Sequence, residues 1–228
     1  EPVTQEQLDA YEVGFKASLA DGAAQLNGSA FYYDYTDKQL LSKVADPNFG
    51  ALSKLVNVPD SEVTGVEFDL QWQPLDGLFI ALAATYLDTE VKELTAFTQA
   101  GDIQYDLSGS KFPFTPEWQA NGIVNYEWPA SDSLTAFVGA DINYSGSFQT
   151  DYANENAPLE SFYDIDSATK LGLRAGVRAT DDSWSVMAWG RNVTDEYAVN
   201  TALNSVDYIL QYPGMPATYG ISFTYNWF

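Results

Sequence analysis

Long runs of alternating apolar and polar residues dominate this sequence. In residues 11–19, 66–72, 134–144 and 171–177 every second residue is apolar, and the residues between are mostly polar or glycine. A period of two places the apolar side chains on one face of a β-strand and the polar ones on the other. No window shows a convincing helical period of 3.6 residues. We therefore expect an all-β chain.

The expected strands are long, and the connections between them alternate in length. They run to ten residues or more, whereas strands of soluble globular proteins usually have about five or six. Turn-forming residues make short connections at 20–22, 74–77, 129–133 and 180–183, and long connections lie at about 45–54, 94–115, 147–166 and 194–216. This pattern is typical of a transmembrane antiparallel β-barrel. The expected strands are 8–19, 23–44, 55–73, 77–93, 116–128, 133–146, 167–179, 183–193 and 217–228.

The number of strands indicates an incomplete barrel. Short turns of bacterial barrels face the periplasm, long loops face outside, and single-chain barrels have an even number of strands. Nine strands that end at the periplasm begin on the outer side and leave an odd count. We therefore expect residues 1–228 to be part of one barrel domain.

Composition excludes several classes of function. The chain has no Cys and no His, which removes thiolate and imidazole metal sites and the common His-dependent catalysts. A formal net charge of -22 argues against binding nucleic acid, whose phosphates require clustered Lys and Arg. No EF-hand spacing accompanies the acidic loops. We expect no cofactor, no metal site and no enzymatic activity.

Seven segments resemble those of one family, in the family's order. The chain is similar throughout to the C-terminal part of the barrel of TonB-dependent outer-membrane receptors, the iron-siderophore type in particular. The segments are residues 11–17 (YEVGFKA), 26–39 (LNGSAFYYDYTDKQ), 64–70 (TGVEFDL), 78–88 (LFIALAATYLD), 112–118 (FPFTPEW), 191–197 (RNVTDEY) and 216–225 (PATYGISFTY).

The resemblance implies a fold, a location and a set of partners. The family's barrel has 22 strands around a plug domain, of which this chain would supply the last nine strands, with no plug in its own sequence. It implies residence in the bacterial outer membrane and energy-coupled uptake of a ferric siderophore or similar scarce nutrient. The implied partners are the remaining barrel strands, the plug, and an inner-membrane energy-coupling protein that contacts the plug. A passive porin, or a structural wall piece completed by another chain, is the alternative.

Basic residues are concentrated on one expected strand. Lys170, Arg174 and Arg178 lie four residues apart on its polar face, and Arg191 is expected nearby on the next strand. They could form a cationic track in the lumen for an anionic ligand. The alternative is that they pair with carboxylates of the plug or of the lumen wall, for example Asp141.

Aromatic residues near the strand ends suggest a membrane location, and those in the last long loop suggest a ligand site. Loop aromatics on the outer side would line the barrel entrance. Acidic outer loops could meet the outer-membrane lipid and lipopolysaccharide through divalent ions. The expected loop contacts for a small-molecule ligand are Tyr197, Tyr208, Tyr212 and Met215.

The aromatic residues near the strand ends are expected to form girdles, the rings of aromatic side chains that a barrel places at the two membrane interfaces. Carbohydrate stacking is the alternative for them. They are Tyr32, Tyr33, Tyr35, Trp72, Tyr86, Trp118, Tyr126, Trp128, Tyr144 and Trp227.

Overall fold

The computed structural model describes residues 2–46, 48, 50–97, 104–153, 160–204 and 208–227. The predicted strand end at Phe228 and portions of the four outer connections lie outside these residues. Within them, none of the helices has the length and apolarity needed to cross a membrane. The only helical segments among them are two single 3-10 turns, η1 (Ala20–Gly22) and η2 (Glu160–Phe162).

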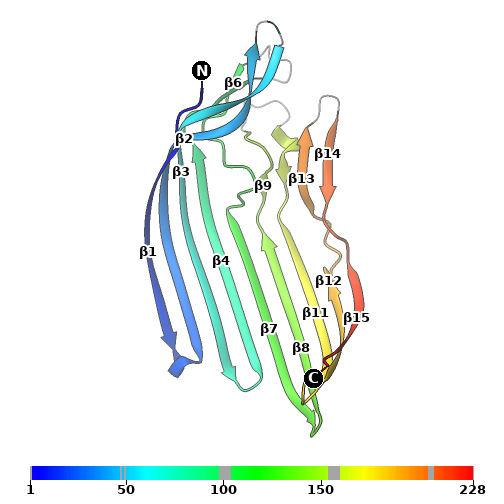
Figure 1. The fold of residues 1–228 in the computed structure, drawn as a ribbon. Coiled ribbons are helices and arrows are strands. Elements are labelled where there is room, and N and C mark those ends of the chain that lie inside the picture. The colour runs from blue at the N-terminus through cyan, green and yellow to red at the C-terminus, as the bar shows by residue number, and fades with distance from the viewer. Residues whose placement is uncertain are drawn as a thin grey trace.

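Nine strands form one curved antiparallel sheet in chain order (Figure 1). Each strand pairs with its sequence neighbour, so the all-β prediction and the count of nine are both confirmed. β1 and β15 are the two edges, and the described sheet does not close on itself. The strands are β1 (Gln7–Leu19), β2 (Ala24–Asp46), β3 (Gly50–Leu75), β4 (Leu78–Val91), β7 (Trp118–Ser131), β8 (Leu134–Ser145), β11 (Ala168–Ala179), β12 (Trp184–Arg191) and β15 (Thr218–Tyr225).

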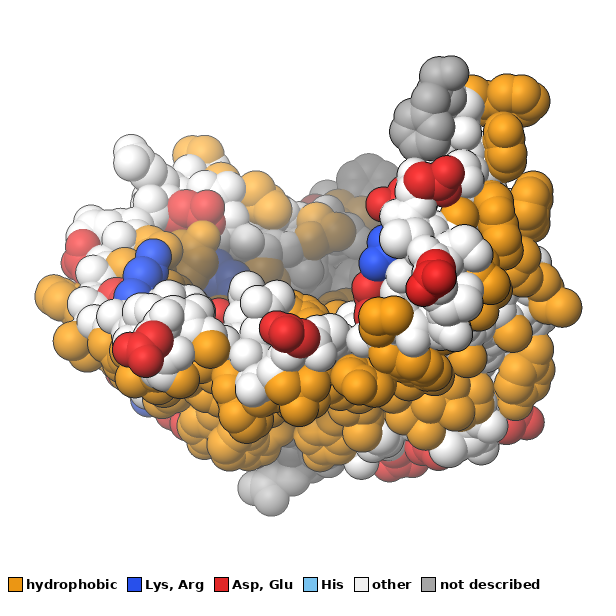
Figure 2. All heavy atoms as spheres, turned by 90° about the horizontal axis from the view of Figure 1, so that it is seen from below, with side chains coloured by type: hydrophobic (Ala, Val, Ile, Leu, Met, Phe, Trp, Pro, Cys, Tyr) orange, Lys and Arg blue, Asp and Glu red, His pale blue; other side chains and the backbone are white. Residues whose placement is uncertain are grey.

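Cross-strand register carries the sequence alternation across the whole sheet. Tyr11 lies opposite Tyr32, Leu26 opposite Leu70, and Leu173 opposite Ala140. Residues directly opposite each other point to the same face, so the apolar set of each strand joins that of the next. Figure 2 shows the result: hydrophobic side chains crowd the convex face, and charged side chains lie along the hollow. The convex face is therefore the membrane face and the concave face the lumen wall.

Aromatic side chains border this apolar face at two levels. Tyr86 lies opposite Trp118 at the upper level, and Trp184 opposite Tyr225 at the lower level. On β7, Trp118 and Trp128 are separated by about 33 Å of strand, or about 25 Å along the membrane normal at a tilt of about 40°. That separation matches the apolar band of an outer-membrane barrel.

Two of the predicted girdle residues lie on the other face. Because Tyr32 points outward, its neighbour Tyr33 and the residue two further on, Tyr35, point into the lumen side. Tyr33 stacks there on Phe31, with ring centroids 4.9 Å apart. The prediction that Tyr33 and Tyr35 belong to an aromatic girdle is therefore wrong. It used only their nearness to a strand end and not the alternation of side chains, which places them on the lumen face.

Five glycines lie directly opposite an aromatic residue of the neighbouring strand. A Cβ added to Gly65 would come within 2.2 Å of the ring of Phe31, its cross-strand partner. The aromatic ring thus occupies the space that a side chain would take, as in the aromatic cover of glycine used in designed sheets. The pairs are Phe15 with Gly28, Phe31 with Gly65, Phe137 with Gly176, Trp189 with Gly220, and Tyr219 with Gly190.

Short turns join the strands at one end, and longer connections lie at the other (Figure 1). Three of the longer connections carry small hairpins of their own: β5 (Thr95–Phe97) with β6 (Gln104–Asp106), β9 (Phe148–Gln149) with β10 (Asp164–Ile165), and β13 (Val199–Asn204) with β14 (Ile209–Pro213).

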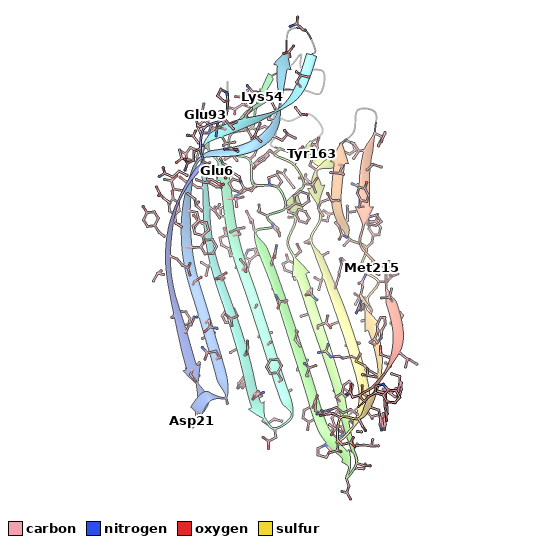
Figure 3. All side chains as sticks on the ribbon, viewed as in Figure 1. Glu6, Asp21, Lys54, Glu93, Tyr163 and Met215 are labelled. Atoms are coloured by element: carbon pink, nitrogen blue, oxygen red, sulfur yellow. The ribbon has the colours of Figure 1, made fainter. Side chains whose placement is uncertain are left out.

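The prediction of a long loop at 45–54 is wrong. β2 and β3 remain paired as far as Asp46 and Gly50. Their ends, residues 38–46 and 50–58, project beyond the sheet as a two-stranded arm, on which Lys54 lies (Figure 3). The arm departs from the wall at Asp37, whose φ is +55°, opposite Pro59. Proline has no N–H to donate to the ladder, so the pairing is interrupted where the chain bends.

The outer connections share a small apolar core. Val58 of the arm packs with Val91, Leu94, Leu107 and Phe112, and with Tyr152 from the next connection. Inward-facing residues at the upper ends of the strands, such as Ser61 and Thr89, are almost completely buried. The connections therefore fold over the lumen side of the wall and cover part of its mouth.

Candidate functional site

The lumen face of β11 carries three of the predicted basic residues. Lys170, Arg174 and Arg178 lie opposite Asn143, Gly139 and Thr135 of β8, all on the concave face. Glycine opposite Arg174 leaves room for the guanidinium to lie along the neighbouring strand. The alternating pattern of β11 thus produces the predicted column of cations.

Two members of this column are neutralised by neighbouring carboxylates. Arg178 makes ion pairs of 2.7 Å with Glu127 and with Asp182. Arg174 lies 3.4 Å from Asp141 and also donates to the side-chain oxygen of Asn125. Pairing with lumen carboxylates, the alternative weighed for these residues, therefore describes Arg174 and Arg178.

The other two cations lie together in a separate pocket. Lys170, Arg191 and Met215 line a cavity of about 390 Å³ at the upper end of β11, β12 and β15. No ion pair joins Lys170 or Arg191 to a carboxylate within the described part of the chain. The Arg191 guanidinium instead stacks over the ring of Trp189, 5.1 Å from its centroid. The pocket can offer both cations to an anionic group.

Asn192 shapes the wall of this pocket. It is 6% exposed and adopts a φ of +49°, a conformation that Asn tolerates better than most residues. Its amide donates to the carbonyls of Glu196 and Met215, at 3.0 and 3.2 Å, and its side-chain oxygen accepts from the Glu196 N–H at 3.0 Å. These bonds hold the two ends of the last outer connection together and place Met215 beside the cations.

The predicted loop aromatics do not enter this pocket. Tyr197, Tyr208 and Tyr212 are well exposed on the connection between β12 and β15, with Tyr212 opposite Thr201 in the β13–β14 hairpin. Met215 is also exposed, on the link from β14 to β15 (Figure 3). Of the eight predicted residues, the structure therefore brings together Lys170, Arg191 and Met215.

Sequence reasoning missed the amides that complete the pocket. Asn143, Asn192 and Asn200 line it and can donate or accept hydrogen bonds. Asn143 could have been found, because it lies on the polar face of its strand directly opposite Lys170. Asn200 reaches the site only through the fold of the last outer connection, which the alternation does not encode.

A second polar group lies in the outer core. The Lys38 Nζ lies 3.3 Å from the ring centroid of Phe112 and 5.4 Å from that of Tyr35. Burial lowers the pKa of Lys38, and nearby Glu6 opposes that effect. Glu6 also accepts a hydrogen bond from the Gln39 N–H. Lys38 thus ties the base of the arm to the connection that follows β4, and Glu6 ties it to the segment before β1.

An apolar convex face, two aromatic levels and a polar concave face define the wall of an outer-membrane β-barrel. The chain belongs to the family of TonB dependent receptor-like β-barrels, whose model matches residues 3–193. Its members are receptors of the outer membrane of Gram-negative bacteria and not enzymes, and this chain is accordingly an outer-membrane protein.

Solved receptors share the fold. The ferric yersiniabactin uptake receptor FyuA from Yersinia pestis is 19% identical over 98% of this chain and 30% of its own, with a TM-score of 0.76. The ferric-catecholate import receptor Fiu from E. coli is 18% identical over 96% and 27%, with a TM-score of 0.67. The iron transporter FrpB from Neisseria meningitidis is 15% identical over 98% and 32%, also with a TM-score of 0.67. The chain thus spans about three tenths of the length of these proteins.

Proposed function

We propose that this chain forms the C-terminal nine strands of a receptor barrel that imports a ferric siderophore or a similar scarce nutrient by energy-coupled transport. Membership of the receptor family supports this proposal, as do relatives described as a ferric yersiniabactin uptake receptor and a ferric-catecholate import receptor.

The pocket of Lys170 and Arg191 is the observation that carries the proposal. Lys170 and Arg191 line one pocket without an ion pair to any described residue, and Asp141, the carboxylate that also lines it, lies 3.4 Å from Arg174. Two positive charges in one pocket repel each other, so a negative charge placed between them would be stabilised. An anionic ligand moving down the lumen wall, or a carboxylate of a plug, supplies that charge. Met215 and the exposed Tyr197, Tyr208 and Tyr212 would make the first contacts at the mouth.

Other partners follow from the open sheet. The outer edges of β1 and β15 carry backbone groups that must be paired inside a membrane, because no water is present to bond them. Further strands, from the same or another chain, would close the barrel to the 22 strands of the family. A plug would fill a lumen of that size. An inner-membrane protein would transmit energy to the plug, while lipid and lipopolysaccharide would surround the wall.

Radioactive-iron uptake by cells that produce the assembled receptor tests this function, with ferric enterobactin and ferric yersiniabactin as probes. Lys170→Gln and Arg191→Gln should each weaken binding of the transported probe by about tenfold, the effect of one lost charge-assisted hydrogen bond. Lys16→Gln is the matched control, since Lys16 also faces the lumen, opposite Asn27, but lies outside the pocket. Equal effects of all three substitutions on binding of the transported probe would contradict the proposal.

Energy dependence separates this function from a passive pore or a structural wall piece. Active import should stop when the proton gradient is collapsed, and binding to the cell surface should remain. A passive pore would continue to conduct small solutes under the same conditions, and a wall piece would do so only after its partner chain is supplied. Ion conductance of the purified barrel in planar bilayers gives the same distinction without a ligand.

A further inference from the structure

The pocket of Lys170 and Arg191 also contains a carboxylate. Asp141 lines it from β8 and lies opposite Gly172 of β11. A Cβ added to Gly172 would come within 2.4 and 2.6 Å of the two carboxylate oxygens, so the Asp141 side chain extends over β11. Arg191 of β12 lies beside Gly172 on the other side, because the residues that precede Arg191 and follow Gly172 are directly opposite each other. One glycine thus separates a carboxylate from a guanidinium on the lumen face.

The Asp141 carboxylate can still accept hydrogen bonds. Its Oδ1 lies 3.4 Å from the Arg174 Nη1, and its Oδ2 accepts from the Asn143 amide, also at 3.4 Å. Both distances are long, since charge-assisted bonds between nitrogen and carboxylate oxygen usually measure about 2.7–2.9 Å. An ionised carboxylate offers about four acceptor positions. Asp141 therefore has room for a further cationic donor.

The Lys170 ammonium lies against the base of the last outer connection. Its Nζ is 3.1 Å from the position that a Cβ of Gly214 would take, and the Ala198 carbonyl and the Asn200 side-chain oxygen are each 3.3 Å from the same position. These neighbouring oxygens are neutral and leave the positive charge uncompensated. The pocket therefore presents two cations and one carboxylate within about 390 Å³.

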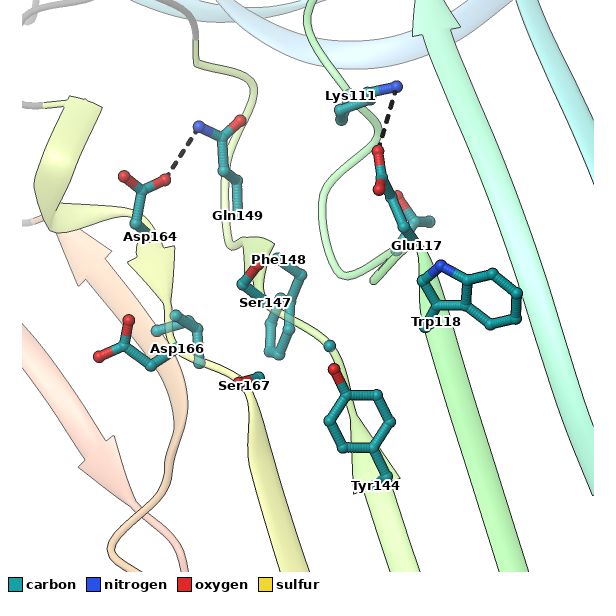
Figure 4. A pocket seen from close by; sticks show the side chains of 13 residues that line it. Lys111, Glu117, Trp118, Tyr144, Ser147, Phe148, Gln149, Asp164, Asp166 and Ser167 are labelled. Carbon is teal, nitrogen blue, oxygen red and sulfur yellow. Dashed lines mark hydrogen bonds and ion pairs between the residues drawn. The ribbon is translucent and has the colours of Figure 1, made fainter.

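A larger pocket at the upper ends of β7, β8 and β11, of about 620 Å³, shows the contrast (Figure 4). Lys111 is the one cation among its described lining residues, and it pairs with Asp88 and lies 3.7 Å from Glu117. Its charged groups thus compensate one another. Lys170 and Arg191 have no such ion pair within the described chain, so the lumen pocket has charge to offer a ligand.

A group that carries both charges fits this lining better than a simple anion. A simple anion compensates Lys170 and Arg191 but also meets the negative charge of Asp141, which repels it. A zwitterion places a carboxylate beside the two cations and an ammonium against Asp141. We propose that the pocket binds a free amino-acid group, with its ammonium and carboxylate on one carbon, of the transported ferric siderophore. This inference rests on the proposed function and names a substrate class for it.

Saturation-transfer NMR titrations of the assembled receptor test the proposal with three fragments of similar size. Alanine carries both charges, propionate only the carboxylate, and ethylammonium only the ammonium. The Kd of alanine should be about tenfold lower than that of propionate, the effect of one charge-assisted hydrogen bond. Asp141→Asn should abolish this preference without weakening propionate. Gly172→Ala should also reduce it, since the added Cβ displaces the carboxylate but keeps its charge.

Asp69→Asn is the matched control. Asp69 also lies on the lumen face, opposite Asn27 and bonded to its amide, but outside the pocket, so this variant should keep the preference for alanine. Equal binding of alanine and propionate to the wild type would overturn the proposal. Ethylammonium binding as tight as that of alanine, no saturable binding of alanine, or equal effects of Asp141→Asn and Asp69→Asn would do the same. Heat-modified migration on electrophoresis verifies that each variant remains a folded barrel.

Iron uptake by the same receptor separates this inference from the proposed function. A receptor that imports ferric siderophore but binds alanine and propionate equally refutes the zwitterion site alone. A receptor that prefers alanine but imports no ferric siderophore in an energy-dependent way refutes the transport role and leaves a lumen site for amino-acid groups.

Discussion

Truncating Phe112 to alanine should open the outer core without unfolding the barrel wall. Phe112 is 9% exposed, packs edge-on against Tyr152 with ring centroids 6.3 Å apart, and lies under the Lys38 ammonium. Phe→Ala substitutions in packed cores cost about 3–5 kcal/mol. Because this core belongs to the connections and not to the sheet ladder, that cost should fall on local opening.

The magnitude can be measured at single amides. A loss of about 4 kcal/mol raises a local opening constant by about a thousandfold. The Leu107 N–H, which donates to the Leu94 carbonyl at 2.7 Å, and the Gly109 N–H, which donates to the Val91 carbonyl at 2.7 Å, should therefore exchange with solvent about a thousandfold faster. Amides of the β8–β11 ladder should keep their protection, since they share no contact with Phe112.

Phe114 offers the matched control for this experiment. It lies two residues further on in the same connection, is 53% exposed, and packs on Phe148 with ring centroids 6.0 Å apart. Phe114→Ala should cost less than about 1.5 kcal/mol, the worth of one aromatic pair. Unchanged exchange at Leu107 in Phe112→Ala, equal effects of the two truncations, or general loss of protection in the sheet would each refute the shared outer core.

Three further predictions concern the outer core, the sheet and the lumen pocket. Burial, with smaller effects of Asp151 and Tyr35, raises the pKa of Tyr152 to about 12. The un-ionised Tyr152 phenol therefore contributes stability that is complete below pH of about 10 and is lost as the pH rises through about 12. A tyrosinate absorbance titration should accordingly contain a late step that Tyr152→Phe removes. Gly65→Val should displace the Phe31 ring and lower the temperature at which the barrel loses its heat-resistant migration, with a cost of about 1–3 kcal/mol, whereas Gly65→Val combined with Phe31→Ala should recover part of it. Asn192→Ala removes three hydrogen bonds and should increase proteolytic cleavage between residues 193 and 217 and weaken ligand binding; unchanged cleavage would show that these bonds do not organise the connection.

The strands could be predicted from the sequence because alternation and turn residues agree. The segment 133–146 was expected as a strand, and the structure has β8 at Leu134–Ser145. Only the end of the arm was missed. Pro47 and Asn48 resemble the start of a loop, so the two strands were expected to end at 44 and to resume at 55, whereas they remain paired to Asp46 and Gly50. Whether two strands stay paired up to such a loop signal depends on contacts between both strands, and the sequence of one strand alone does not indicate it.

The lumen site was only partly predictable for a related reason. Spacing along β11 places three cations on one face but says nothing of which neighbour faces each of them. Whether a cation is neutralised depends on cross-strand register: Asp141 lies opposite Gly172, two positions from Arg174, and can reach it, while Lys170 lies opposite Asn143. The amides of the last connection depend on tertiary folding, which no local pattern records.

The five aromatic–glycine pairs have a consequence for assembly of the wall. If one strand slides by a single residue, its apolar face turns inward, and the hydrophobic pattern alone opposes the error. A slide by two residues keeps every apolar side chain facing lipid, so hydrophobicity cannot detect it. Such a slide moves the ring of Phe31 off Gly65 and onto Val63 or Glu67, where a side chain already fills the space. Size matching between neighbouring strands therefore distinguishes registers that polarity leaves equivalent, at the joins β1–β2, β2–β3, β8–β11 and β12–β15.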